Sequence, residues 1–195
     1  NYPVVIAGSL AIRMNWTEQL NSLRIPIFTT VSAKGVVDET LDCSAGIYTG
    51  NGLEITPEYS LISDADLVIG LGLRSEEVLS VNPFPCTSVN IDLLLPETFG
   101  GFEFQTTTSP NNIDVVFDQL AMRNWGLDRL FSLKSDLDKF LSRDRFLPIH
   151  VFRQLTEKFG DFMRLVVDTG YFCTIAEHCF RSTTSSHFLC SGNSR

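Results

Sequence analysis

The sequence predicts an α/β protein with a Rossmann-like parallel sheet covered by helices on both faces, followed by a truncated second α/β unit. Two observations support this fold class. Short apolar runs such as Pro3–Ala7 show no alternation of polar and apolar residues, which is typical of strands buried on both faces. These runs alternate along the chain with segments whose apolar residues recur three or four positions apart, as on one face of a helix. Strands alternating with helices indicate a parallel sheet.

The strands and helices of the first part follow one another in a regular order. Five strands are predicted, at residues 3–7, 26–30, 67–71, 87–92 and 102–107. Three helices are predicted, at residues 11–23, 57–65 and 112–122. In the second of them, Thr56 is suited to the N-cap and Pro57 to the first helical position. Residues 36–52 carry Gly, Asp, Asn and Thr, which predicts a long loop.

The apolar positions of the other two helices define their buried sides. They are Ile12, Trp16, Leu20 and Leu23 in the first helix, and Ile113, Val116, Phe117 and Leu120 in the last. These elements give a first domain at residues 1–123. The charged stretch at 124–147 is interpreted as a linker with some helix.

A second unit is predicted at residues 148–195. It would contain a helix that begins at Pro148, a strand at 165–167 and a helix that ends near Phe180. Three such elements are too few to bury a core of their own. We therefore expect a domain that is cut short, and that packs on the first domain, pairs with another copy or is loosely held.

Composition limits the function classes. The 195 residues carry 15 Lys and Arg against 23 Asp and Glu, a net charge of −8. Binding to nucleic acids or anionic membranes depends on clustered basic residues, so neither partner is expected. The longest apolar runs, such as Leu67–Leu71, are far shorter than the roughly 20 residues of a membrane helix. With no targeting segment visible, the sequence predicts a cytoplasmic protein.

The cysteines are interpreted as free thiols. Five cysteines are scattered along the chain, an odd number, in apolar surroundings, as is common in a reducing compartment. A zinc site was considered from the residues Cys173, His178, Cys179, His187 and Cys190. They lack the short spacing that puts two ligands on one turn, so no metal site is predicted.

Several motifs, in register over almost the whole chain, resemble the thiamine-diphosphate enzyme superfamily, which includes pyruvate decarboxylase, indolepyruvate decarboxylase and acetolactate synthase. They are Pro26–Thr30 (PIFTT), Ala33–Glu39 (AKGVVDE), Gly46–Gly50 (GIYTG), Ala65–Gly72 (ADLVIGLG), Val89–Asp92 (VNID) and Leu165–Gly170 (LVVDTG). The GIYTG segment is closer to the decarboxylases than to the synthases. The resemblance implies a central domain followed by the start of a diphosphate-binding domain.

The resemblance implies thiamine diphosphate and Mg²⁺ as cofactors of the complete enzyme, a small 2-oxo acid as substrate and a homo-oligomer. The family's Gly-Asp-Gly … Asn-Asn metal motif and its catalytic glutamate are not among these residues. We therefore expect a fragment of a 2-oxo acid decarboxylase that has no catalytic residues and is inactive alone. The alternatives are a fragment of an acetolactate synthase-like carboligase, or a non-catalytic nucleotide-binding or interaction module on the same fold.

The resemblance also names candidate binding residues. It implies that Thr169 and Gly170 contact the diphosphate, with Tyr171 beside them. This agrees with the close backbone approach that glycine permits and with the attraction of a helix N-terminus for anions. The alternative is a simple strand-to-helix turn. Gly8 and Ser9 end the first strand and Asp92 ends a later one, where an α/β sheet can hold a nucleotide. An empty structural crevice is the alternative there.

The sequence departs from the family at the flavin-binding signature and at the glycine before Lys34. Leu73–Glu77 replaces the Arg-Phe-Asp-Asp signature with which flavin-containing synthases hold FAD, so FAD is not expected. Ala33 replaces the first glycine of the family's Gly-Lys-Gly. Lys34 follows a strand end, where it would pair with an anion or, as we expect, be a solvated turn lysine.

Overall fold

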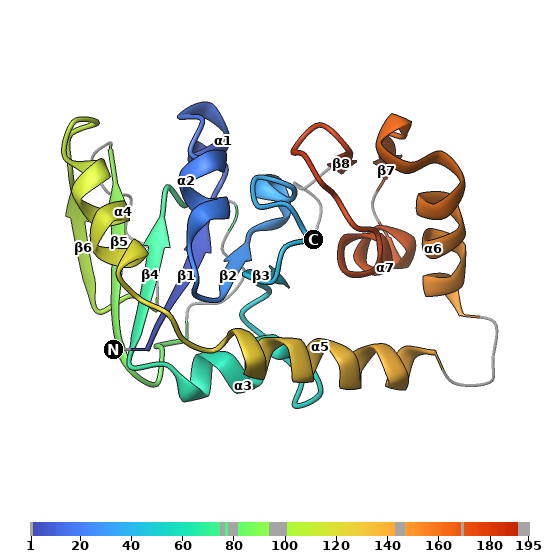
Figure 1. Ribbon diagram of the computed structural model, residues 1–195, viewed down its shortest axis with the longest axis horizontal. Coiled ribbons are helices and arrows are strands. Elements are labelled where there is room, and N and C mark those ends of the chain that lie inside the picture. The colour runs from blue at the N-terminus through green and yellow to red at the C-terminus, as the bar shows by residue number, and fades with distance from the viewer. Residues whose placement is uncertain are drawn as a thin grey trace.

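The computed structural model confirms the α/β class. It describes residues 2–74, 77, 82–93, 101–142, 147–168 and 170–190. A six-stranded sheet has all its strands parallel, in the order β3-β2-β1-β4-β5-β6 (Figure 1). These strands are β1 (Pro3–Ala7), β2 (Ile27–Thr29), β3 (Ser44–Ile47), β4 (Leu67–Leu71), β5 (Thr87–Asp92) and β6 (Phe104–Thr107).

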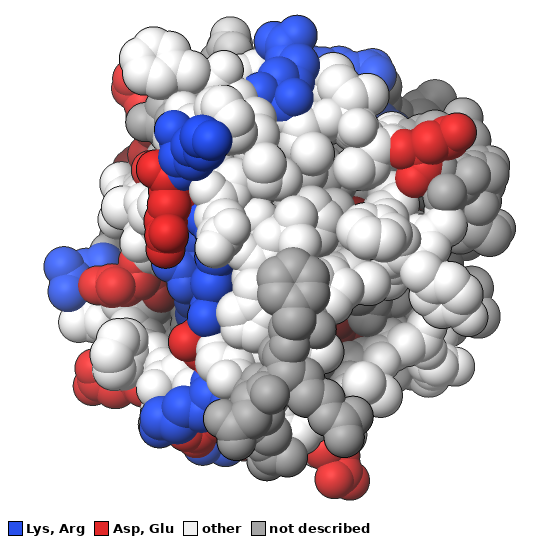
Figure 2. Space-filling model, turned by 90° about the vertical axis from the view of Figure 1, so that its right-hand side faces the viewer, with Lys and Arg blue, Asp and Glu red and all other residues white. Residues whose placement is uncertain are grey.

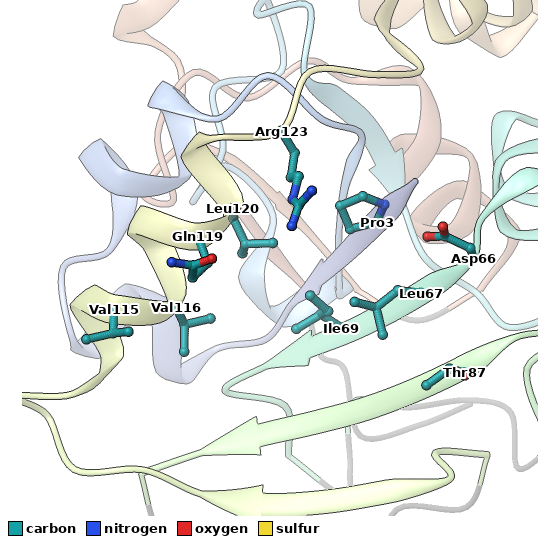
Figure 3. Close-up of a pocket in the computed structure, with 10 residues that line it drawn as sticks. All are labelled: Pro3, Asp66, Leu67, Ile69, Thr87, Val115, Val116, Gln119, Leu120 and Arg123. Atoms are coloured by element: carbon teal, nitrogen blue, oxygen red, sulfur yellow. The ribbon is translucent and has the colours of Figure 1, made fainter. Parts of the chain in front are cut away.

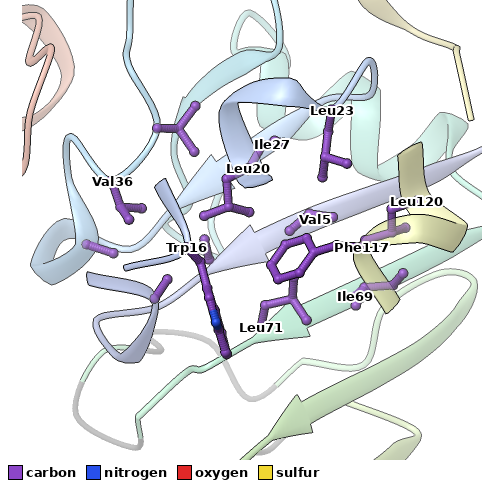
Figure 4. Close-up of a cluster of buried hydrophobic side chains, with 14 of the residues drawn as sticks. Val5, Trp16, Leu20, Leu23, Ile27, Val36, Ile69, Leu71, Phe117 and Leu120 are labelled. Carbon is purple, nitrogen blue, oxygen red and sulfur yellow. The ribbon is translucent and has the colours of Figure 1, made fainter. Parts of the chain in front are cut away.

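Helices cover the sheet on both faces. They are α1 (Leu10–Arg13), α2 (Thr17–Ser22), α3 (Pro57–Asp64), α4 (Ile113–Ala121) and α5 (Leu127–Leu141), with a short 3₁₀ helix η1 (Val31–Ala33) after β2. Strand β1 serves both faces, since Val5 packs in the cluster with α1, α2 and α4 while Val4 packs with α3 and α5. Figure 4 shows the first of these clusters, with Trp16 and Phe117 meeting over the strands.

Two predicted elements differ in detail. The segment predicted as one helix at 11–23 forms two short helices, because Asn15 adopts a left-handed backbone with φ of 55°. Strand β3 lies inside the segment predicted as a loop. Its four residues include a glycine and pair with β2 across a register shift, so the strand has no apolar pattern that would reveal it.

The segment between the two units is more regular than a linker with some helix. Helix α5 is continuous over 15 residues, and its Leu130 is completely buried against the sheet. The neighbouring Phe131 is 72% exposed. Just before the helix, the indole N–H of Trp125 donates to the carbonyl of Pro3 at 2.6 Å, which fixes the start of α5 to strand β1.

The C-terminal unit has its own small sheet. Helix α6 (Pro148–Phe159) and a 3₁₀ helix η2 (Gly160–Phe162) precede β7 (Leu165–Val167), α7 (Tyr171–Cys179) and β8 (Phe188–Cys190). Strands β7 and β8 are parallel, with α7 as their crossover. The second strand, β8, was not predicted. The unit buries a small core around Phe152, Phe180 and Phe188.

The AKGVVDE segment joins the two units. Lys34 is 3% exposed, and its Nζ donates to both carboxylate oxygens of Glu39, at 2.6 and 2.7 Å. Glu39 in turn accepts from the backbone N–H of Ser182 at 2.7 Å, and its own N–H donates to the carbonyl of Ser182. The expectation of a solvated Lys34 is therefore wrong, because its anionic partner is buried beside it.

Glycine at position 35 makes this contact possible. Gly35 has φ of 82°, and a Cβ atom there would lie 2.3 Å from the carbonyl oxygen of Thr184. The ammonium group of Lys34 also lies 5.6 Å from the centre of the Phe188 ring. The loop after β2 and the strand β8 region are therefore in direct contact, and the C-terminal unit packs on the N-terminal one.

We expect Glu39→Gln to lower the free energy of unfolding by about 3–5 kcal/mol, because it leaves the Lys34 charge buried without its counter-ion. The double variant Lys34→Met, Glu39→Gln should recover part of this loss. Urea unfolding measures the energy, and amide exchange of residues 182–190 reports whether the contact between the units opens. Lys139→Met, which removes an exposed lysine, is the control. A Glu39→Gln protein as stable as the control would contradict this role of the ion pair.

Candidate functional site

The direction of the strand order reverses next to β1, and in open α/β sheets a ligand crevice is commonly found at the carboxyl edge of such a point. From β1 the chain moves in one direction to β2 and β3, and later returns to β4 on the other side. The connections that follow β1 and β4 therefore diverge, which is where open α/β sheets bind ligands. Gly8 and Ser9 follow β1, and Asp92 ends β5 at the same edge. The structure brings these predicted residues to one side of the sheet.

An internal carboxylate lies at the end of β1. The N–H of Ser9 donates to Glu77 at 3.0 Å, and the hydroxyl of Thr30 donates to the same oxygen at 3.2 Å. Position 8 has no room for a side chain, since a Cβ atom on Gly8 would lie 2.4 Å from the carbonyl oxygen of Gly72. Glu77 thus takes the donors that would face a nucleotide phosphate.

Asp92 is also engaged within the chain. It is 2% exposed and forms an ion pair with Arg74, while the N–H of Leu93 donates to its other oxygen at 2.6 Å. Arg74 and Glu77 both come from the segment that replaces the flavin signature. Ser75 and Glu76 of that segment lie outside the described residues. Arg74 therefore binds the carboxylate at the end of β5, and Glu77 binds the N–H group that follows β1.

The strand-to-helix turn of the C-terminal unit is open. Gly170 has φ of 121°, and among the described residues beyond its chain neighbours no atom lies within 4 Å of the position that its Cβ would take. It precedes α7 without a side-chain cap, and Tyr171 is 91% exposed. Thr169 lies outside the described residues. The backbone of Gly170 is therefore accessible to a ligand, and this turn belongs to a different sheet from Gly8, Ser9 and Asp92.

The GIYTG segment has a packing role. The ring of Tyr48 is buried, and burial together with the Glu58 charge raises its pKa. The N–H groups of Thr49 and Gly50 donate to the carboxylate of Glu58 at 2.9 and 2.7 Å. This motif thus attaches the loop after β3 to helix α3.

A hollow of about 930 Å³ lies between the units, lined in part by α5, α6 and α7. Lys134 faces it and donates to the carbonyl of Ser44 at 3.0 Å. Burial, with the nearby charge of Arg181, lowers the pKa of Lys134. Sequence reasoning did not identify this lysine, because residues 124–147 were interpreted as a linker.

A second hollow, of about 550 Å³, lies at the opposite edge of the sheet. Figure 3 shows Pro3, Leu67 and Thr87 on the strands facing α4 residues such as Val116 and Leu120. It opens at the amino ends of β1, β4 and β5. Ligands of open α/β sheets bind at the carboxyl ends, so this hollow is not the expected site.

On the face occupied by α6, the basic side chains of the described residues form no broad area. Figure 2 shows acidic and basic side chains next to one another on its left, further charged groups at the top, upper right and lower right, and uncharged residues between them. Within the described residues, no helix combines the length and the hydropathy that crossing a membrane requires.

The comparison with known families gives one match. Residues 1–94 match the family described as "Thiamine pyrophosphate enzyme, central domain". The match covers slightly less than half of the chain and shows that this part is similar to the central domain of thiamine-diphosphate enzymes. It does not distinguish decarboxylases from other members, and it covers neither the Gly170 turn nor the rest of the C-terminal unit. Among curated proteins, none gives a significant match to this chain.

We expect Glu77→Gln to create an anion site at the end of β1, because it removes the negative charge that Ser9 and Thr30 now face. Addition of ADP should then shift the amide resonance of Ser9 in NMR spectra of the variant and leave it unchanged in the unmodified protein. Glu103→Gln, at an exposed position, is the control. An equal ADP-dependent shift in both the unmodified protein and the variant would show that Glu77 does not block the crevice.

Proposed function

We propose that this chain is part of a thiamine-diphosphate- and Mg²⁺-dependent 2-oxo acid decarboxylase. In this proposal, residues 1–123 are the central domain, 124–147 connect it, and 148–195 begin the diphosphate-binding domain. The family match over residues 1–94 is the observation that carries the proposal. The strand-turn-helix at residues 165–179 supports it, since it follows the central domain in the order expected of the superfamily.

The residues of the Gly170 turn fit one part of the cofactor. Thiamine diphosphate, when bound, supplies the electron sink for loss of CO₂. The protein has to hold the anionic diphosphate, and an open glycine before a helix N-terminus suits that task. Gly170 would allow a phosphate oxygen to approach the backbone, and Tyr171 would lie beside it. The proposed Mg²⁺ ligands belong to a family motif that these 195 residues do not contain.

The N-terminal unit would act as the support of this turn. The Lys34–Glu39 pair holds residue Ser182, which follows α7 in the chain. Since α7 begins at the Gly170 turn, the position of that turn relative to the large sheet depends on this contact. The central unit would therefore contribute by orienting the diphosphate-binding residues, without supplying a reacting group.

The decarboxylase branch is favoured by the GIYTG segment over a carboligase. A nucleotide-binding module is less favoured, because Glu77 and Arg74 already engage the donors and the carboxylate at the crevice. FAD is not part of the proposal for the same reason. The proposal further includes a homo-oligomer and a small 2-oxo acid as substrate, both implied by the resemblance.

The proposal is tested in the complete enzyme that contains this chain. We expect CO₂ release from a 2-oxo acid that requires thiamine diphosphate and Mg²⁺, with an aldehyde as product. Gly170→Ala should weaken the apparent affinity for thiamine diphosphate at least about tenfold, because alanine disfavours φ of 121° and adds a Cβ at the turn.

Gly160→Ala is the matched control. Gly160 also has a positive φ, of 53°, and open space around its Cβ position, but it ends helix α6. It should lower stability without changing cofactor affinity. Equal effects of the two substitutions on cofactor affinity would remove Gly170 from the site, whereas a complete enzyme that consumes no 2-oxo acid would refute the function itself.

A further inference from the structure

Three side chains of the C-terminal unit converge in a way that the sequence did not suggest. Cys173 and Glu177 are four residues apart on α7 and so share one face of the helix. Cys190 ends β8, opposite Val167 of β7. The two sulfur atoms and a carboxylate oxygen all lie within 4.8 Å of one another. The Sγ of Cys173 is 3.2 Å from Oε1 of Glu177.

The group is largely withdrawn from solvent. Glu177 is 1% and Cys173 is 6% exposed, and Cys190 is half-buried. A carboxylate and two sulfur atoms gathered in a small core form an environment in which a cation would be favoured.

We propose that Cys173, Glu177 and Cys190 bind one Zn²⁺ ion, with a water molecule as the fourth ligand. In tetrahedral zinc sites the metal–sulfur and metal–oxygen distances place ligand atoms about 3.5–3.8 Å apart. The observed separations, 3.2 Å for one pair and no more than 4.8 Å for the others, lie on either side of that spacing. Thiolate ligands select Zn²⁺ over Mg²⁺ or Ca²⁺, which prefer oxygen.

The site differs from the zinc set considered from the sequence. That set contained Cys173 and Cys190 but lacked Glu177, and its His178, Cys179 and His187 are not part of the group. His178 and Cys179 follow Glu177 directly on α7, and adjacent residues of a helix face different directions. The two cysteines are 17 positions apart, and the crossover helix brings them together. Linear spacing therefore could not reveal the site.

Binding would connect the helix of this unit to its second strand. Each thiol would release its proton to solvent as it binds the ion, so the affinity should rise with pH. Since the ion would bind the folded arrangement and not the separated ligands, it would stabilise the C-terminal unit. The site is independent of the proposed diphosphate contact at Gly170 and of Mg²⁺.

The experiment uses the whole 195-residue chain, reduced and freed of metal by a chelator. We expect one equivalent of Zn²⁺ to bind in competition with a chromophoric chelator, and excess Mg²⁺ to leave this binding unchanged. Substituting Co²⁺ should produce a sulfur-to-metal charge-transfer absorption band. X-ray absorption of the zinc form should give two sulfur and two oxygen neighbours.

Variants then assign the ligands. Cys173→Ser and Cys190→Ser should each remove the charge-transfer intensity of one thiolate and weaken Zn²⁺ binding at least about tenfold, and Glu177→Gln should weaken it while keeping both thiolates. Cys43→Ser and Cys86→Ser, which change cysteines outside the group, should bind as the unmodified chain does. Circular dichroism checks that each variant is folded.

Some results would overturn the proposal whether or not the variants fold. They are no charge-transfer band in the unmodified chain, fewer than two sulfur neighbours, or affinity that survives removal of either cysteine. A disulfide between Cys173 and Cys190 in protein purified with reductant would equally exclude the metal site, because both thiolates would be consumed.

Discussion

The arrangement of the two units depends on one buried ion pair. A lysine and a glutamate withdrawn from water are tolerable only if each satisfies the other and the remaining oxygen positions find donors. Lys34 and Glu39 meet this condition with Ser182, a residue 143 positions further along the chain. The pair links a loop of the large sheet to the segment between α7 and β8. A motif that looks like a solvated turn in the sequence thus forms a buried polar contact between the units.

The carboxyl edge of the large sheet illustrates how a fold is separable from the site that it commonly carries. The strand order, the glycine at the end of β1 and the carboxylate at the end of β5 are all present. Yet Glu77 accepts the hydrogen bonds that a phosphate would accept, and Arg74 neutralises Asp92. The same chain segment between β4 and β5 provides both groups.

The sequence predicted the parts of the fold that have strong periodic signals. Strands β1 and β4 are continuous apolar runs, and the buried side of α4 follows from Ile113, Phe117 and Leu120. Strand β3 was missed because its pairing depends on a bulge against β2, and the break at Asn15 because the apolar spacing continues across it. In the candidate site, the positions of Gly8, Asp92 and Gly170 at strand ends were predictable. The partners Glu77, Arg74, Ser182 and Glu177 were not, because each arrives from a distant or neighbouring element through tertiary packing.

Helix α5 determines more than the coverage of one sheet face. Its 15 residues correspond to about 22 Å of rigid rod, anchored at the start by Trp125 and along one side by Leu130. Adding one residue within it would rotate everything that follows by about 100° about the rod axis and advance it by about 1.5 Å. The number of residues in α5 therefore sets both the distance and the rotation between the segments at its two ends. Chain-length variation that preserves the two-unit arrangement has to fall in loops, such as the one before α3, and not in α5.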